Sequence, residues 1–136
     1  MTPENYSVLL LDAGERSSAS LEVIETSKDC TRLTLRAKDR VFDAAAKDCF
    51  AALQQLRRVL SKEGLDLLCY GASRDVYPSG MGRSMGGGRK AYRNVIGQPA
   101  RDPVVSIFDS GPEIIAASVD EQESFHRQWV ESLRKS

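Results

Sequence analysis

The chain has 136 residues, of which 41% are hydrophobic and 28% are charged, and its formal net charge is zero. These values are typical of one water-soluble globular domain covering residues 1–136, with enough apolar surface for a single core. They exclude a helical membrane protein, because no apolar run approaches the roughly 20 residues that span a bilayer, and they argue against a strongly basic nucleic-acid-binding domain.

The N-terminus and the cysteines indicate a cytoplasmic protein. No basic segment precedes an apolar one in MTPENYSVLL, so a signal peptide is not expected. The three cysteines, Cys30, Cys49 and Cys69, are odd in number and include no Cys-x-x-Cys pair. Neither a disulfide framework nor a zinc site fits this pattern. We therefore expect reduced thiols, no metal and no cofactor.

The N-terminal part of the chain predicts three strands in a meander, over residues 5–12, 20–27 and 31–37. The second and third strands alternate apolar and polar side chains with a period of two. This alternation is typical of antiparallel strands with one face in the core. The polar residues 15–20 and 27–29 are predicted to be turns.

The hydrophobic period then becomes helical. Apolar side chains recur at spacings of three and four between Phe42 and Leu60, which predicts an amphipathic helix over residues 41–63. Asp39 or Asp43 is placed to cap its start, and Gly64 is placed to end it in a left-handed conformation. Cys49 lies on the apolar stripe and is expected to be a buried filler of the core.

The C-terminal half predicts more strands and a second helix. The strands cover residues 65–73, 90–97 and 104–111, and the helix covers residues 118–134, with a capping box at its start. The predicted fold is α+β, with the order β-β-β-α-β-loop-β-β-α. We expect a mostly antiparallel sheet of five or six strands with both helices packed on one face.

Residues 71–101 are the least regular part of the chain and the most basic. They hold seven of the ten glycines, and six basic residues against the single acid Asp75, a local charge of +5. Long segments of this kind inside compact domains are usually functional. We predict that the function of the protein lies here.

The glycines do not form a known phosphate-binding motif. Lys90 comes late in the glycine-rich run and no hydroxyl residue follows it, as a Walker loop would need. Glycines 80, 82 and 86 have spacings of two and four, which does not fit a dinucleotide fingerprint. An RNA- or nucleotide-binding protein, or a phosphoryl-transfer enzyme using residues 74–93 with Asp75, stays open as an alternative. His126 is interpreted as a surface residue of the last helix.

One stretch of the sequence resembles a known class of proteins. The string Tyr70-Gly-Ala-Ser-Arg-Asp-Val-Tyr-Pro-Ser-Gly-Met81, followed by Gly86-Gly-Gly-Arg-Lys-Ala-Tyr92, is similar to immunity proteins of bacterial contact-dependent growth inhibition systems. The resemblance covers roughly residues 65–133. It implies a cytoplasmic protein that binds and neutralises the C-terminal toxin domain of a cell-surface effector, which we expect to be nuclease-like. These proteins share no catalytic motif, so the resemblance assigns no site residue. The sequence has no nucleophile-base pair, metal-ligand cluster or complete phosphate motif, so we separately predict no enzyme activity.

The residue types of the segment also favour protein binding. Tyrosine and arginine dominate the energetics of protein interfaces, and a local charge of +5 would attract an acidic partner. Glycine would let the two backbones approach closely. The predicted partner-binding residues are Arg74, Asp75, Tyr77, Arg83, Arg89, Lys90, Tyr92 and Arg93.

Overall fold

The fold is α+β, as the sequence predicts. The computed structural model describes residues 2–134. In chain order its elements are β1 (Glu4–Asp12), β2 (Glu15–Ser27), β3 (Cys30–Ala37), β4 (Arg40–Ala46), α1 (Cys49–Ser61), β5 (Leu65–Leu67), the 3₁₀-helix η1 (Tyr70–Ala72), β6 (Val76–Tyr77), α2 (Gly80–Gly86), β7 (Lys90–Arg93), β8 (Val105–Ser106) and α3 (Val119–Arg134).

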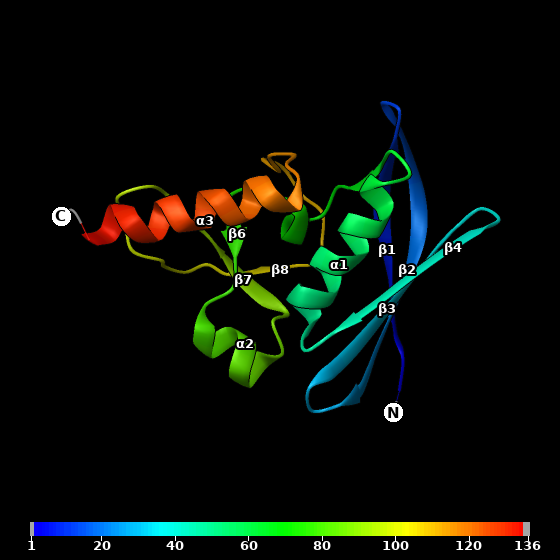
Figure 1. Ribbon diagram of the computed structural model, residues 1–136, viewed down its shortest axis with the longest axis horizontal. Helices are drawn as coiled ribbons and strands as arrows, with labels where there is room; N and C mark the ends of the chain where they lie inside the picture. The colour runs from blue at the N-terminus through cyan, green and yellow to red at the C-terminus, as the bar shows by residue number, and fades with distance from the viewer. Residues whose placement is uncertain (1, 135–136) are drawn as a thin grey trace.

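The main layer is an antiparallel five-stranded sheet that curls around α1 (Figure 1). Its strand order is β4-β3-β2-β1-β5, so sequence neighbours from β1 to β4 pair as a meander. Alternate side chains of each strand point toward α1, and they meet the buried stripe of that helix. The core is formed by Val8, Leu10, Leu21, Val23, Leu33 and Leu35 of the strands and by Phe50, Leu53, Leu56 and Leu60 of the helix. Cys49 is fully buried there, as expected.

Residues 40–46 form the strand β4, so the predicted helix over residues 41–63 is wrong in its first part. Phe42 is paired with Leu35 across the sheet, and positions 42, 44 and 46 are half-buried while 41, 43 and 45 are exposed. Alanines at 44–46 fit a period of two as well as a helical period, so the pattern could not separate the two. The helix starts at Cys49, and its cap is Asp48, whose carboxylate accepts a hydrogen bond from the Ala51 amide at 2.7 Å.

Other strands also begin or end at residues different from those predicted. The strand β2 begins at Glu15, because Ala13 and Gly14 form the turn with φ of 50° and 85°, so residues 15–20 are strand and not turn. The predicted strands over residues 65–73 and 104–111 shrink to β5 and β8, which have three and two residues. Gly64 does end the α1 region in a left-handed conformation, with φ of 73°.

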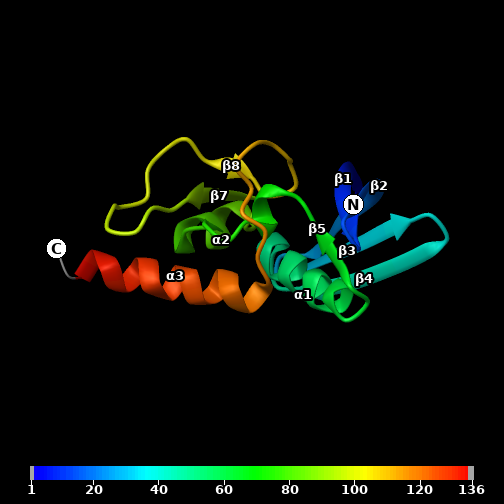
Figure 2. The ribbon, with the colours of Figure 1, turned by 90° about the horizontal axis from the view of Figure 1, so that it is seen from above.

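The C-terminal part forms a second sheet that the sequence did not predict. It has the order β6-β7-β8, with Tyr77 opposite Tyr92 and Lys90 opposite Ser106. Helix α3 runs alongside this small sheet and approaches α1 with its N-terminal end (Figure 2). The predicted pair of helices therefore does not cover one sheet face. Helix α1 covers the large sheet, and α3 belongs to the second part.

A buried pair of polar side chains joins the two parts. Arg57 of α1 is 5% exposed and Gln122 of α3 is 0% exposed. Arg57 donates to Gln122 Oε1 at 2.6 Å and to the Ala117 carbonyl at 2.8 Å. Gln122 Nε2 lies 2.9 to 3.0 Å from the carbonyl oxygens of Gly71, Ser73 and Val76. One amide thus links α3 to both α1 and the segment that leads into β6.

Replacing this amide tests its role. We expect Gln122→Leu to lower the free energy of unfolding by about 3 kcal/mol, because it removes one acceptor of a buried guanidinium and leaves three carbonyl oxygens without the amide that donates to them. Urea denaturation monitored by circular dichroism measures the change. The control is Gln128→Leu on the exposed side of the same helix, which should stay within about 0.5 kcal/mol of wild type. Equal stability of the two variants would show that the joint is dispensable.

Candidate functional site

The glycine-rich segment is folded around the short helix α2. Ser79 caps this helix by accepting a hydrogen bond from the Gly82 amide at 2.9 Å. Gly87 ends it in the left-handed conformation, with φ of 67°. At Gly88 a Cβ atom would lie only 3.1 Å from the Phe50 backbone nitrogen. Glycine at position 88 therefore lets the segment pack directly against the start of α1.

Three arginines of the segment pair with acids of the same chain. Arg83 Nε lies 2.9 Å from Asp48 Oδ2, and Arg93 Nε lies 3.4 Å from Asp75 Oδ2. Arg89 contacts Glu25 at 2.6 Å and Glu4 at 2.7 Å, on strands β2 and β1. The bridges of Arg83 and Arg89 fasten the segment to the cap of α1 and to the large sheet, and the bridge between Arg93 and Asp75 lies within the segment. Much of its positive charge is therefore neutralised inside the protein.

The remaining predicted residues differ in their surroundings. Asp75 also accepts a hydrogen bond from Ser73 Oγ at 2.7 Å, so it anchors its own loop. The Arg74 guanidinium lies 5.5 Å from the centre of the Phe125 ring, and its side chain is exposed. Lys90 is exposed on β7. Binding of a partner by the eight predicted residues stays a prediction. Arg74 and Lys90 are the basic residues among them that form no ion pair in the described structure.

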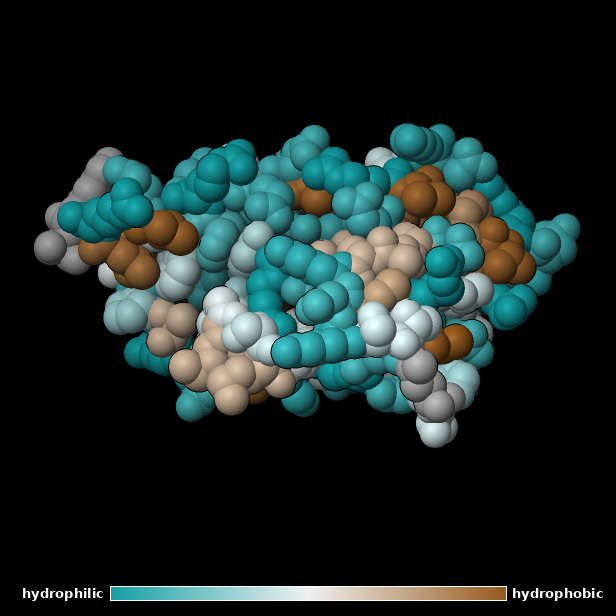
Figure 3. Space-filling view, turned by 60° about the horizontal axis from the view of Figure 1, so that its bottom comes forward, coloured by the Kyte–Doolittle hydropathy of each residue, from teal (hydrophilic) through white to brown (hydrophobic). Residues whose placement is uncertain are grey.

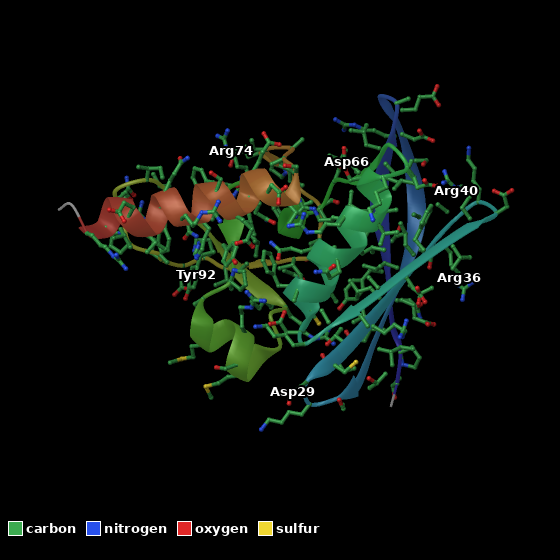
Figure 4. All side chains as sticks on the ribbon, viewed as in Figure 1. Asp29, Arg36, Arg40, Asp66, Arg74 and Tyr92 are labelled. Atoms are coloured by element: carbon green, nitrogen blue, oxygen red, sulfur yellow. The ribbon has the colours of Figure 1, made fainter. Side chains whose placement is uncertain are left out.

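A groove lies on one side of α2. It has a volume of about 820 Å³ and separates α2 from the turn between β2 and β3 and from the start of α1. Asp29 marks that turn in Figure 4, at the same end of the molecule as α2. The groove is lined from α2 by Ser84 and Met85 and from the opposite side by Lys28, Asp29 and Lys47.

Two methionines give this end of the molecule an apolar projection. Met81 is 71% exposed and Met85 is 82% exposed, and they stand one helical turn apart on α2. Figure 3 looks toward this end, where hydrophobic patches are set in a mostly hydrophilic surface. Large apolar side chains exposed as neighbours are typical of interaction surfaces.

An aromatic cavity lies on the other side of α2, between this helix, β6 and β7, and α3. Its volume is about 460 Å³, and Tyr92 lies between α2 and α3 in Figure 4. Tyr77 stacks on His126 with ring centres 3.6 Å apart, and Trp129 follows with its centre 5.7 Å from His126. The Tyr77 hydroxyl donates to Glu123 at 3.0 Å, which fixes this ring against α3.

Two side chains of the cavity wall, Asn94 and His126, each have one buried polar atom without a hydrogen-bond partner in the described structure. Asn94 is 5% exposed, and its Oδ1 atom is buried and accepts no hydrogen bond. The Nδ1 atom of His126 is also buried and forms no hydrogen bond. Burial lowers the pKa of His126; nearby Glu123 opposes this effect and Arg83 adds to it. The interpretation of His126 as a surface residue is therefore wrong, because its ring is half-buried against Tyr77.

The sequence identified only part of these surfaces. Of the predicted residues, Tyr77, Arg83 and Tyr92 line the aromatic cavity. Asn94, His126 and Trp129 were missed, although His126 and Trp129 are three residues apart on one predicted helix and thus share a face. The α2 methionines were missed as a pair because the segment was taken as a loop.

Comparisons of the chain with models of protein families and with curated proteins found no match. The resemblance to immunity proteins therefore rests on the residues quoted above. Within residues 2–134, no group of three or more His, Cys, Asp or Glu side chains is placed to hold a metal ion. None of the described helices is long and apolar enough to cross a bilayer.

Removal of Arg89, which bridges Glu4 and Glu25 of the large sheet, should lower the stability of the fold. We expect Arg89→Met to lower the free energy of unfolding by about 1 kcal/mol, since it leaves two carboxylates of the large sheet without their common cation. The loss should shrink in high salt, where such bridges are screened. Arg101→Met is the control, because Arg101 is exposed and its substitution should change stability by less than about 0.5 kcal/mol. Thermal melts of Arg89→Met and Arg101→Met at low and high salt measure the difference between the two variants.

The single histidine should make stability depend on pH. Because the pKa of His126 is lower in the folded protein than in the unfolded chain, protons bind the unfolded state first as the pH falls below about 6.5. The free energy of unfolding should therefore decrease between pH 7 and pH 5. His126→Phe, which keeps a ring against Tyr77, should flatten the curve in this window. An unchanged slope in the variant would assign the effect to carboxylates.

Proposed function

We propose that this protein is a non-catalytic binding protein and that its partner is the toxin domain of a bacterial contact-dependent growth inhibition system, which it neutralises in the cytoplasm. The observation that carries the proposal is the exposure of Met81 and Met85 beside the groove of about 820 Å³. The residue resemblance supplies the class of partner. The protein would bind through the groove and the projecting face of α2.

The chemistry of this surface suits a protein partner. Methionine side chains are flexible and polarisable, so they adapt to an apolar surface with little strain. Burying two of them in an interface would remove a large apolar area from water. This surface therefore combines exposed apolar side chains, a groove and a polar rim, as protein interfaces do.

The charges around the groove predict the complementary charge of the partner. Lys28 and Lys47 line it and are exposed, and Lys90 is exposed on the neighbouring β7. Of the acids in the lining, Asp48 is paired with Arg83 and Glu25 with Arg89, whereas Asp29 is exposed and forms no ion pair within the described residues. The three lysines outnumber this one acid, so a toxin surface with carboxylates around an apolar depression would fit this arrangement and associate faster at low salt.

The reactive groups support a non-catalytic role. Burial raises the pKa of the Cys49 thiol to about 11 and that of the Cys69 thiol to about 11, so neither is a thiolate nucleophile at neutral pH. The His126 ring is stacked between Tyr77 and Trp129. Asp75 is engaged by Ser73 and Arg93.

Co-purification with the product of the adjacent upstream gene, which the proposal expects to carry the toxin domain, tests the proposal. We expect the two to co-purify, and Met81→Ser/Met85→Ser to weaken the complex by about 10- to 100-fold, as loss of two interface anchors does. Val41→Ser is the control, because Val41 is 56% exposed on β4 but outside the groove, and it should bind like wild type. If Met81→Ser/Met85→Ser binds as tightly as wild type, α2 is not part of the interface.

The absence of activity is tested separately. The purified protein should not turn over RNA, DNA or nucleoside triphosphates. Turnover above background that disappears in Asp75→Asn or His126→Gln, with the fold retained by circular dichroism, would contradict the non-catalytic assignment.

A further inference from the structure

The outer strand of the large sheet has one unpaired backbone edge. Strand β4 comes first in the order β4-β3-β2-β1-β5, so β3 is its only strand neighbour in the described structure. The turn between β3 and β4 projects from the body of the molecule, away from α3 (Figures 1 and 2). An edge of this kind offers a row of N–H and C=O groups to any extended strand that can pair with it.

The hairpin geometry identifies the free backbone groups. Ala37 and Arg40 face each other across the turn between β3 and β4, so they form a hydrogen-bonded pair. Hydrogen-bonded pairs then alternate along the two strands, and Val41, Asp43 and Ala45 direct their N–H and C=O groups away from β3. Within residues 2–134 these groups form no backbone hydrogen bond on that side.

The devices that commonly protect a sheet edge are absent from β4. The strand contains neither proline nor lysine, and its pairing with β3 runs without a bulge over all seven residues, Arg40–Ala46. Its two charged side chains are held by their own chain, Arg40 by Glu63 at 2.8 Å and Asp43 by Arg32 at 3.1 Å. The edge is therefore regular and accessible along its whole length.

We propose that two copies of the protein pair antiparallel through β4, about a two-fold axis at Asp43, so that their five-stranded sheets become continuous. This register pairs all seven residues of the strand with the same seven residues of the second copy. An axis between two residues would place core-facing side chains opposite outward-facing ones. An axis at Phe42 or Ala44 would leave part of the strand unpaired. Closed two-fold contacts are the commonest way in which identical chains associate.

The side chains of β4 are complementary in size in this register. Val41 lies opposite Ala45 of the second copy on the outer face, and Phe42 lies opposite Ala44 on the face toward α1, so each larger side chain meets a small one. In the single chain Val41 is 56% exposed and Phe42 is half-buried. Pairing would remove apolar surface of both from water, and such cross-strand pairs stabilise a sheet.

The charges that flank the strand are complementary as well. Asp39 and Lys47 are exposed, and neither forms an ion pair within the described residues. The register brings Asp39 of each copy beside Lys47 of the other, at both ends of the paired strands. The one unfavourable contact is at the axis, where Asp43 faces Asp43 of the second copy. Arg32 of each chain neutralises part of this charge.

Sedimentation velocity tests the dimer and the edge that forms it. We expect the wild-type chain to shift from monomer to dimer between about 1 and 300 µM, as befits a small interface. Ala45→Pro removes an N–H that faces the second copy and not β3, so dimerisation should weaken at least about tenfold while the circular dichroism spectrum is unchanged. Ala45→Thr keeps this N–H and suits a strand, and as the matched control it should dimerise within about threefold of wild type.

Cross-linking tests the register. A Cys30→Ser background removes the one cysteine that is not buried. In it, Asp43→Cys places two thiols directly opposite each other, at a Cα separation of about 5.5 Å that a disulfide can span. Val41→Cys places them roughly 14 Å apart along the strands. Mild oxidation should therefore link the Asp43→Cys chains and leave the Val41→Cys chains unlinked. Asp43→Asn, which removes the repulsion at the axis, should dimerise more tightly than wild type.

Three results would overturn the inference: a wild-type chain that stays monomeric at about 300 µM, equal dimerisation by Ala45→Pro, or equal disulfide yields from the two cysteine variants. Toxin binding by Ala45→Pro is measured in parallel. If wild type is monomeric and this variant loses toxin binding, the edge pairs with a strand of the toxin and not with a second copy. A monomeric Ala45→Pro that binds the toxin like wild type would support a dimer edge separate from the groove.

Discussion

The contact between Arg57 and Gln122 is the constraint on which the arrangement of the molecule depends. Arg57 is 5% exposed and forms no ion pair within the described residues. Its guanidinium charge is stabilised by the Gln122 amide oxygen and by backbone carbonyls. The same amide occupies the carbonyls before β6. Buried polar groups tolerate few alternative geometries, because each displaced partner is costly. This network therefore fixes α3 relative to α1 and to the segment that leads into β6.

The basic character of the glycine-rich segment has an internal use. Arg83 and Arg89 join the segment to Asp48, Glu25 and Glu4. These three acids therefore neutralise part of the positive charge of the segment and hold it in place. These bridges hold α2 at the end of the molecule beside the β2–β3 turn (Figure 1). The methionines are exposed as a consequence, since α2 has no buried residue of its own.

Helix α2 separates two surfaces of different chemistry. Gly80 and Arg83 line both the groove and the aromatic cavity. The groove is larger and has a charged border, and the cavity is smaller and walled by aromatic rings. One short helix forms a wall of each, and Arg83 of that helix is held by its bridge to Asp48.

The sequence by itself determined the α+β class, the first three strands, α3 with its capping box, and the buried position of Cys49, because periodicity and capping are local properties of the chain. It did not separate β4 from α1, since alanines fit both periods, and it did not show the second sheet, whose strands β6 and β8 have two residues each. The groove and the aromatic cavity both border the segment that the sequence predicts to be functional, but the chemistry of these surfaces was decided by tertiary structure. Asn94, His126 and Trp129 come together only where α3 lies against the small sheet. Arg83 and Arg89 form ion pairs only because the fold brings acids from distant parts of the chain beside them. Contacts between residues far apart in sequence leave no local pattern, so only the folded chain specifies them.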